Sequence, residues 1–172
     1  NTFTGDQVIN GNTVGKGNNS VIGNVAVGGQ ALNSSNSGIG YNVGVGFKSL
    51  RLNTSGHSNV SVGGFALTAN TSGTQNVAVG RNVLSSNTTG SDNVAMGSYS
   101  LDANTTGASN VAIGQEALSS STTANHCTAV GHDSLKANTT GSPNTAVGNL
   151  ALTSNTTGSR NVGVGHDALR LN

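Results

Sequence analysis

A sequence motif of seventeen residues repeats along this chain, and this period constrains the fold more than any other feature. Regular repetition of this kind indicates an array in which each unit contacts only its neighbours. The step between copies is constant, except for one extra residue in the first step. With the Asn of "NVAVG" as position 1, the copies begin at Asn24, Asn42, Asn59, Asn76, Asn93, Asn110, Cys127, Asn144 and Asn161.

Positions 2 to 5 of the repeat predict a short β-strand that ends at a glycine. Positions 2 and 4 carry Val, Thr, Met or Ile, position 3 carries Ala, Gly or Ser, and position 5 is always Gly. Alternating β-branched residues are typical of a strand, and a constant Gly suits a corner with positive φ. Position 9 is always Leu. We expect inner apolar ladders from positions 2, 4 and 9, including Val77, Val79, Leu84, Val94, Met96, Leu101, Val111, Ile113 and Leu118.

The "NTTG" phrase at positions 12 to 15 predicts a second corner. Asn and Gly tolerate left-handed backbone, and Asn and Thr side chains bond to nearby main chain. The two Gly positions and the Thr pairs oppose a helix. Each repeat is therefore predicted to form one coil, with two short strands, of an all-β parallel β-solenoid. Coils stacked at about 4.8 Å would make a rod roughly 43 Å long, with the Asn side chains of position 1 in a polar ladder.

The core of such a rod is thin, and this predicts self-association. Only 33% of the residues are apolar, and the chain has no Trp, three Phe and two Tyr. A core built from so few large groups buries little surface. The small side chains of position 3, expected to point outward, suit close approach of another chain. We expect a homotrimer, intertwined or side by side, with a lone solenoid as the alternative.

The repeats divide the chain into residues 1–23, an N-terminal cap or degenerate repeats, and residues 24–172, the nine copies. The segment "NNSVIG" (Asn18–Gly23) resembles a decayed copy, and an extra residue falls within Asn33–Tyr41. The chain begins without Met, and the ninth copy stops part-way at Asn172. This pattern predicts a mature product or a fragment of a longer protein.

Charge and hydropathy argue against two classes of partner. The formal net charge is +1, and the few Lys and Arg side chains form no basic stripe, so nucleic acid is not expected to bind. No apolar run approaches the roughly 20 residues that span a membrane, so no membrane insertion is expected in this segment. Cys127 is the single cysteine, which excludes a disulfide within the chain.

No arrangement of residue types predicts an active site or a metal site. The "GVG" pieces lack the context of a dinucleotide fingerprint and are interpreted as corners. His132 and His166 lie two coils apart, roughly 10 Å, which is too far to share a metal. The six acidic residues fall on different coils and corners, whereas glycoside cleavage needs two carboxylates at one bond. We therefore predict no enzyme, no catalytic residue, no metal and no cofactor, and a buried stacking role for Cys127.

Six "NTS" or "NTT" triplets match the acceptor pattern for N-glycosylation, but they recur because the corner recurs. Turn formation is the favoured interpretation. The repeated Thr residues also raise an ice-binding solenoid as an alternative, although adjacent Thr residues in a strand point to opposite faces. The triplets begin at Asn53, Asn70, Asn87, Asn104, Asn138 and Asn155.

Positions 6 and 7 vary from copy to copy, with only the pair His-Asp occurring twice, and they are the predicted recognition surface. Three of the five aromatic residues lie there, where they would line one edge of the rod. Exposed rings beside polar groups can stack on sugars or anchor a protein partner, and sealing of the corners is the alternative. The candidate receptor contacts are Phe47, Lys48, Phe65, Arg81, Asn82, Tyr99, His132, Asp133, His166 and Asp167.

The phrases "NVAVGxxAL", "NVAIGQEAL" and "NTAVGNLAL", joined by "NTTGS", resemble the head repeats of trimeric autotransporter adhesins. The longer form seen here is also similar to repeats in bacteriophage tail fibres and tailspikes. The resemblance covers residues 24–172 and implies a left-handed parallel β-roll within a trimer. The chain departs from the adhesins in its longer repeat, and it shows no heptad stalk, neck or anchor.

Together, the repeats and the resemblance predict a rigid trimeric shaft or head that presents, or itself makes, multivalent contacts with a cell-surface receptor. The expected partners are copies of the chain and a host glycan or protein. The expected location is extracellular, in a virion tail fibre or on the bacterial outer surface. Two alternatives stay open: a tailspike-type enzyme that degrades polysaccharide with carboxylates from neighbouring chains, and the ice-binding solenoid.

Overall fold

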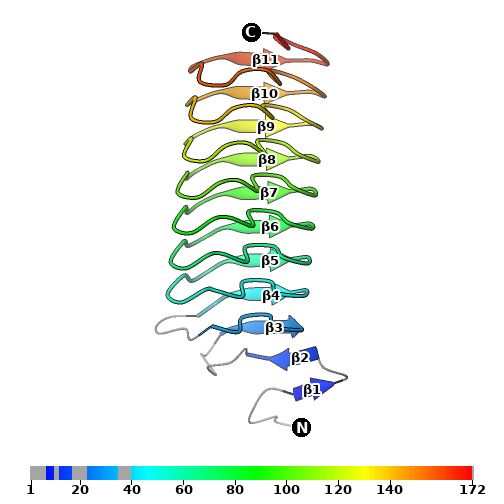
Figure 1. Cartoon of the computed structure of the whole chain (residues 1–172), viewed down its shortest axis with the longest axis vertical. Coiled ribbons are helices and arrows are strands. Elements are labelled where there is room, and N and C mark those ends of the chain that lie inside the picture. The colour runs from blue at the N-terminus through cyan, green and yellow to red at the C-terminus, as the bar shows by residue number, and fades with distance from the viewer. Residues whose placement is uncertain (1–6, 10–11, 17–22, 35–39, 172) are drawn as a thin grey trace.

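The protein is a parallel β-solenoid, as the repeat predicts (Figure 1). The computed structural model describes residues 7–9, 12–16, 23–34 and 40–171. Each complete repeat from residue 42 onward forms one coil, and the coils stack into a rod with β1 at one end and β11 at the other. One sheet of 11 strands runs along this rod in sequence order, and the described residues contain no helix.

Nine of these strands, one from each repeat, pair in parallel with equivalent positions side by side. Val77 of one strand, for example, pairs with Val94 of the next. The strands cover positions 2 to 4, and the first also includes the Gly of position 5. Their bounds are β3 (Val25–Gly28), β4 (Val43–Val45), β5 (Val60–Val62), β6 (Val77–Val79), β7 (Val94–Met96), β8 (Val111–Ile113), β9 (Thr128–Val130), β10 (Thr145–Val147) and β11 (Val162–Val164).

Two strands before the first repeat run antiparallel to their neighbours. β1 (Gln7–Ile9) pairs with β2 (Asn12–Gly15), and β2 pairs with β3. This hairpin covers the edge of β3, which would otherwise offer unpaired main-chain groups. The predicted decayed copy, apart from Gly23, and the centre of the 33–41 insertion lie outside the described residues.

The strand faces the opposite way from our prediction. The side chains and glycines of position 3 are buried in every coil, whereas the side chains of positions 2 and 4 are half-buried or exposed. Position 3 faces the Leu of position 9, because a Cβ on Gly44 would lie 3.3 Å from Leu32 Cγ. The coil is so thin that Leu fills the space from one side and only a small residue fits opposite. The inward orientation predicted for Val77, Val79, Val94, Met96, Val111 and Ile113 is therefore wrong.

The buried Leu ladder at position 9 is confirmed. Leu84, Leu101 and Leu118 are fully buried with their equivalents, except in the last coil, where Leu169 is 48% exposed. The Leu residues have φ values of 46–52°, in the left-handed region. This bend replaces the second strand that we predicted for each coil with a series of turns. Main-chain bonds still join these turns from coil to coil, as from Leu84 N–H to the Ser100 carbonyl at 3.1 Å.

The polar ladder of Asn side chains at position 1 is also confirmed. Asn76 Nδ2 donates to Asn59 Oδ1 at 3.1 Å and to the Gly90 carbonyl at 2.9 Å. Asn76 Oδ1 accepts the main-chain and side-chain amides of Asn93, at 3.0 and 3.1 Å. The side chain is fully buried, yet both of its polar atoms are paired twice. A buried polar row is stable under these conditions because no donor or acceptor lacks a partner.

A second buried Asn ladder occupies position 12, at the start of the "NTTG" corner. Asn87 Nδ2 donates to Asn70 Oδ1 at 2.9 Å and to the Gly90 carbonyl at 3.0 Å. The next residue adds a hydroxyl row, in which Thr71 Oγ1 donates to the Thr88 carbonyl at 2.9 Å. The turn interpretation of the Asn-Thr triplets is therefore confirmed. The hydroxyl protons of this Thr row are used within the stack.

Two adjacent coils interrupt the Asn ladders, the first of them at position 12 and the second at position 1. The first coil has Ser121 at position 12 and Ala124 at position 15, and Cys127 takes the place of Asn at position 1 of the second. Asn104 Oδ1 and Ser121 Oγ are buried there without a hydrogen-bond partner. The two substitutions depend on each other because the side chains at positions 12 and 15 of one coil are close together. In a regular coil, for example, a Cβ added to Gly90 at position 15 would lie 2.5 Å from Asn87 Oδ1 at position 12. Ala124 therefore excludes Asn at position 121.

Restoring this ladder requires two changes together. We expect Ser121→Asn with Ala124→Gly to stabilise the fold by about 1–2 kcal/mol, because Asn104 Oδ1 gains its missing donor. Ser121→Asn alone is expected to destabilise it, because the new amide meets the Ala124 methyl group. Urea unfolding of the two single variants and the double variant measures the coupling. A double variant no more stable than Ser121→Asn would contradict this explanation.

Candidate functional site

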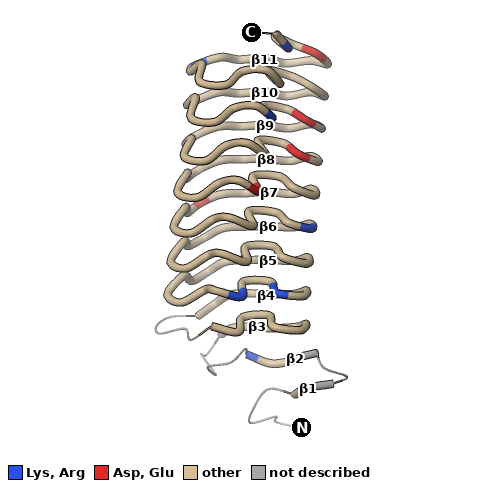
Figure 2. The backbone as a smooth tube through the Cα atoms, in the orientation of Figure 1, with Lys and Arg blue, Asp and Glu red and all other residues tan. Residues whose placement is uncertain are grey.

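The variable positions 6 and 7 lie along one edge of the rod, next to the Gly corner. The residue at position 7 has a φ of 55–62° in every coil, so each coil makes the same bend and presents its side chain at the same place. Many of the charged residues lie along this edge, basic beside β4 and β6 and mostly acidic beside β8, β9 and β11 (Figure 2). The charge of the edge therefore changes from basic to mostly acidic along the rod, while the backbone conformation at position 7 is the same in every coil.

The basic part of the edge contains an aromatic and cationic cluster. The rings of Phe47 and Phe65 meet edge to face, with centroids 5.4 Å apart and an interplanar angle of 81°. Lys48 Nζ lies 5.0 Å from the Phe47 centroid and 5.5 Å from the Phe65 centroid, within the range of a cation–π contact. Phe47 remains 48% exposed. These rings therefore pack across coils and still offer surface to a partner.

The next coils along carry Arg81, Asn82 and Tyr99. The Arg81 guanidinium carbon lies 5.7 Å from the centroid of the Tyr99 ring in the following coil. Asn82 occupies the shared bend with a φ of 55° and is half-buried. The structure thus brings Arg81 and Tyr99 into one cross-coil contact.

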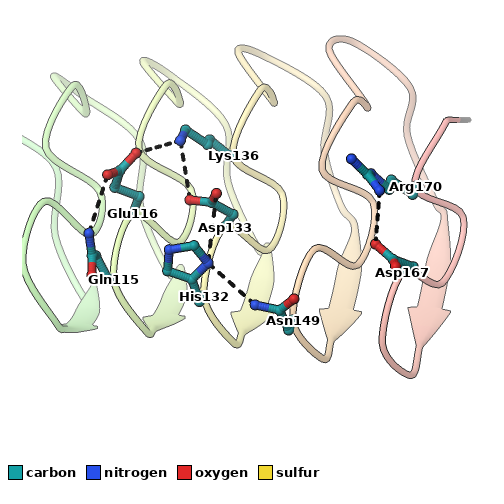
Figure 3. Close-up of polar contacts among 8 residues, drawn as sticks. All are labelled: Gln115, Glu116, His132, Asp133, Lys136, Asn149, Asp167 and Arg170. Atoms are coloured by element: carbon teal, nitrogen blue, oxygen red, sulfur yellow. Dashed lines mark hydrogen bonds and ion pairs between the residues drawn. The ribbon is translucent and has the colours of Figure 1, made fainter.

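An ion-pair network connects the coils of β8 and β9 (Figure 3). Lys136 Nζ lies 2.5 Å from Glu116 Oε2 and 3.2 Å from Asp133 Oδ1. The hydrogen bond from Lys136 holds the pKa of Glu116 below its usual range, and Glu116 in turn raises the pKa of Lys136. His132 Nδ1 lies 3.7 Å from Asp133 Oδ2 and 3.3 Å from Asn149 Nδ2. This network holds the predicted contacts His132 and Asp133.

The last coil repeats part of this arrangement with Asp167 at its centre (Figure 3). Asp167 Oδ2 lies 3.1 Å from His166 Nδ1, and its Oδ1 lies 3.5 Å from the Arg170 guanidinium. Lys136 and Arg170 both stand at position 10, which we did not include in the recognition surface. Position 10 varies along the chain as positions 6 and 7 do, and that variation was the signal available in the sequence.

An open groove of about 550 Å³ lies between the coils of β7 and β8. Two acidic residues line it, Asp102 at position 10 and Glu116 at position 7 of the following coil. These two acidic residues stand on different coils, as the repeat predicts, but the coils are adjacent and both residues line one groove. Burial raises the pKa of Asp102, and the nearby Glu116 charge raises it further. The groove is lined by Tyr99, Asp102, Ala103, Glu116, Ser119 and Ser120.

The raised pKa of Asp102 predicts a stability difference that depends on pH. The folded state favours the protonated carboxyl more than the unfolded state does, so ionisation at neutral pH costs stability. Asp102→Asn is therefore expected to stabilise the protein at pH 7, and this gain is expected to disappear below about pH 3. Urea unfolding at both values measures it. An equal effect at pH 3 and pH 7 would show that the carboxyl charge is not the cause.

Cys127 lies in the stack, as predicted, and is fully buried. Its Sγ lies 3.4 Å from the Gly141 carbonyl, and burial raises the pKa of the thiol. The reactive form of cysteine is the thiolate, so this environment opposes nucleophilic chemistry.

The structure also bears on metals and membranes. Within the described ranges, no three His, Cys, Asp or Glu side chains are grouped to hold a metal ion. The same residues form no helix that is long and apolar enough to cross a membrane.

Comparison of the chain with protein-family models, with curated proteins and with solved structures gives no match.

Proposed function

We propose that the chain is a segment of a self-associating extracellular fibre, a rigid trimeric shaft or head in which copies of the chain cover one another's strand face. The observation that carries this proposal is the apolar outer face of the sheet. The side chains of positions 2 and 4 form two outward ladders along nine coils. The small side chains of position 3, on which we first based self-association, are inside the coil and do not contribute.

The outer face is apolar in seven of the nine coils, and the other two carry Thr128 and Thr145 at position 2. Val25 is 46% exposed and Met96 is 41% exposed, and Val62, Ile113 and Val147 are also exposed. No charged residue occupies position 2 or 4 in any of the nine copies. Solvated sheet faces and edges normally carry charges that oppose association. Their absence here favours a face that is covered by another protein surface.

The size and regularity of this face favour copies of the same chain as its partner. Nine strands of three residues give a footprint on the order of 400 Å², which is the size of the largest apolar patch on a typical soluble protein, and such patches are often functional. Its ladders repeat at the strand spacing of about 4.8 Å. A partner that matches this spacing over the whole rod must repeat in the same way, as a second copy does. The resemblance to trimeric rods supports three copies.

Association through the strand face would leave the variable edge and the groove available to other partners. The groove involves positions 7, 10 and 11, and the segment around position 9 lies across the core from the strand. A trimer would present three such edges on one rigid particle, so that weak contacts add up to avid binding. We propose that contact with a cell-surface receptor occurs there.

Paired lysine substitutions on the two sides of the coil test the proposal. Val79→Lys with Val147→Lys places charges on the strand face, and we expect it to lower the sedimentation coefficient to that of a monomer. Ser86→Lys with Ser154→Lys places charges at exposed position 11 of the same two coils, and we expect it to leave the assembly intact. Assembly that survives the Val pair, or that is lost equally with both pairs, would contradict the assignment of the face.

A further inference from the structure

We infer that the groove between the coils of β7 and β8 binds a neutral oligosaccharide, with Tyr99 as the stacking ring and Asp102, Glu116, Ser119 and Ser120 as hydrogen-bonding partners for its hydroxyl groups. This inference rests on the proposed role of the variable edge as a contact surface. It does not rest on self-association, because all the lining residues belong to one chain.

The groove is lined by one aromatic ring, that of Tyr99, and by several polar side chains. Its volume of about 550 Å³ is within the range of roughly 300–1,000 Å³ that small-molecule sites occupy. Arg81 lies over the Tyr99 ring from the preceding coil, whereas the other lining residues come from the coil of Tyr99 and the one after it. The cation–π contact with Arg81 restricts the motion of a ring that lines the groove. A fixed ring suits the apolar face of a sugar, because little side-chain freedom is lost on binding.

The polar groups of the groove suit hydroxyl groups. A carboxylate accepts hydrogen bonds, and a serine hydroxyl both donates and accepts. A sugar hydroxyl has the same double capacity, so neighbouring hydroxyls can pair with Asp102 and Ser119 at once. The six lining residues come from two adjacent coils and form a groove that is open to solvent, so a saccharide can extend beyond it along the rod.

Charge distinguishes a neutral saccharide from other polar ligands. The Asp102 carboxylate lines the groove and repels an acidic saccharide or a phosphate group, whereas Lys136 offsets the charge of Glu116. A cationic ligand finds Glu116 already paired with Lys136, at 2.5 Å. Lys136 therefore already offsets one of the two carboxylate charges in the groove. A ligand that offers hydroxyl groups without charge fits best.

The same ion pair argues for binding without cleavage. Glycoside hydrolysis needs one carboxyl as acid and a second as free nucleophile or base. Burial raises the pKa of Asp102, as an acid requires, but Glu116 is held by Lys136, whose hydrogen bond lowers its pKa. We therefore expect the groove to retain a saccharide and to release no new reducing ends.

Saturation-transfer NMR with defined tetrasaccharides tests the inference. The neutral probes are maltotetraose, cellotetraose and chitotetraose, and the acidic probe is tetragalacturonate. We expect at least one neutral probe to bind and the acidic probe to bind at least about tenfold more weakly. Tyr99→Ala and Asp102→Ala are each expected to weaken binding at least about tenfold. Phe47→Ala, which removes an exposed ring elsewhere on the edge, is expected to leave it unchanged.

Three results would overturn the inference: no binding of any neutral probe at about 10 mM, binding that survives Tyr99→Ala, or preference for tetragalacturonate. New reducing ends from the wild type but not from Asp102→Ala would overturn the restriction to binding. The Val79→Lys and Val147→Lys variant keeps the groove intact and is expected to bind the saccharide equally well. Self-association and saccharide binding can therefore fail separately.

Discussion

Gly63→Ala is expected to destabilise the fold by about 3 kcal/mol or more. Gly63 stands at the position 5 corner with a φ of 137°, a backbone conformation that residues other than Gly rarely adopt. An added Cβ would overlap the carbonyl group of Gly80 in the next coil, 2.6 Å from its carbon. The neighbouring backbone cannot move away without disturbing every coil stacked above it. Urea unfolding followed by circular dichroism measures the loss.

Gly64→Ala is the matched control for this substitution. Gly64 is the next residue, it has no positive φ, and nothing lies within 4 Å of a Cβ added there. We expect its free energy of unfolding to stay within about 0.5 kcal/mol of the wild type. Equal effects from Gly63→Ala and Gly64→Ala would contradict the stacking of the Gly corners.

Asn93→Asp is expected to cost about 3–5 kcal/mol at pH 7. Asn93 is fully buried in the position 1 ladder, and its Nδ2 lies 3.1 Å from Asn76 Oδ1 and 2.9 Å from the Gly107 carbonyl. In the variant, a carboxylate oxygen faces two acceptors, where a charge is neither hydrated nor paired. Burial would raise the pKa of the new carboxyl, so the loss is expected to shrink as the pH falls and the carboxyl is protonated.

Asn82→Asp introduces the same change on the variable edge. Asn82 is half-buried in a position where Glu116, Asp133 and Asp167 are the equivalents, so the coil already accommodates an acid there. We expect a change of less than about 0.5 kcal/mol. Urea unfolding of both variants at pH 4 and pH 7 makes the comparison. A small effect of Asn93→Asp at pH 7 would show that the ladder amides are not required.

The coil and its stacking could be predicted from the repeat because each constant residue indicates either a particular backbone conformation or a side chain that stacks on its copies in the neighbouring coils. Gly at position 5 indicates a left-handed corner, Asn at position 1 indicates a polar ladder, and Leu at position 9 indicates a core ladder. The orientation of the strand could not be predicted from the same letters. Val-Ala-Val alternates equally well in either direction, and hydrophobicity favours Val inside. The distance across the coil, which only the structure provides, admits Ala instead.

The candidate site could be predicted only in part. The variation at positions 6 and 7 located the edge that carries Tyr99 and Glu116. The groove itself depends on the turns from position 7 to position 11, which bring Asp102 of one coil next to Glu116 of the following one. Those turns have left-handed backbone at position 7 and at the Leu of position 9, which a strand prediction does not anticipate. The sequence alone therefore did not predict that Asp102 and Glu116 line the same groove.

The molar mass of the particle in solution shows most directly whether copies of the chain cover the outward Val face. Multi-angle light scattering over a range of concentrations is expected to give three times the 16.9 kDa of one chain. The Val79→Lys and Val147→Lys variant provides the monomer reference. A wild-type mass of 16.9 kDa at every concentration would leave that face in water and would contradict the trimeric fibre.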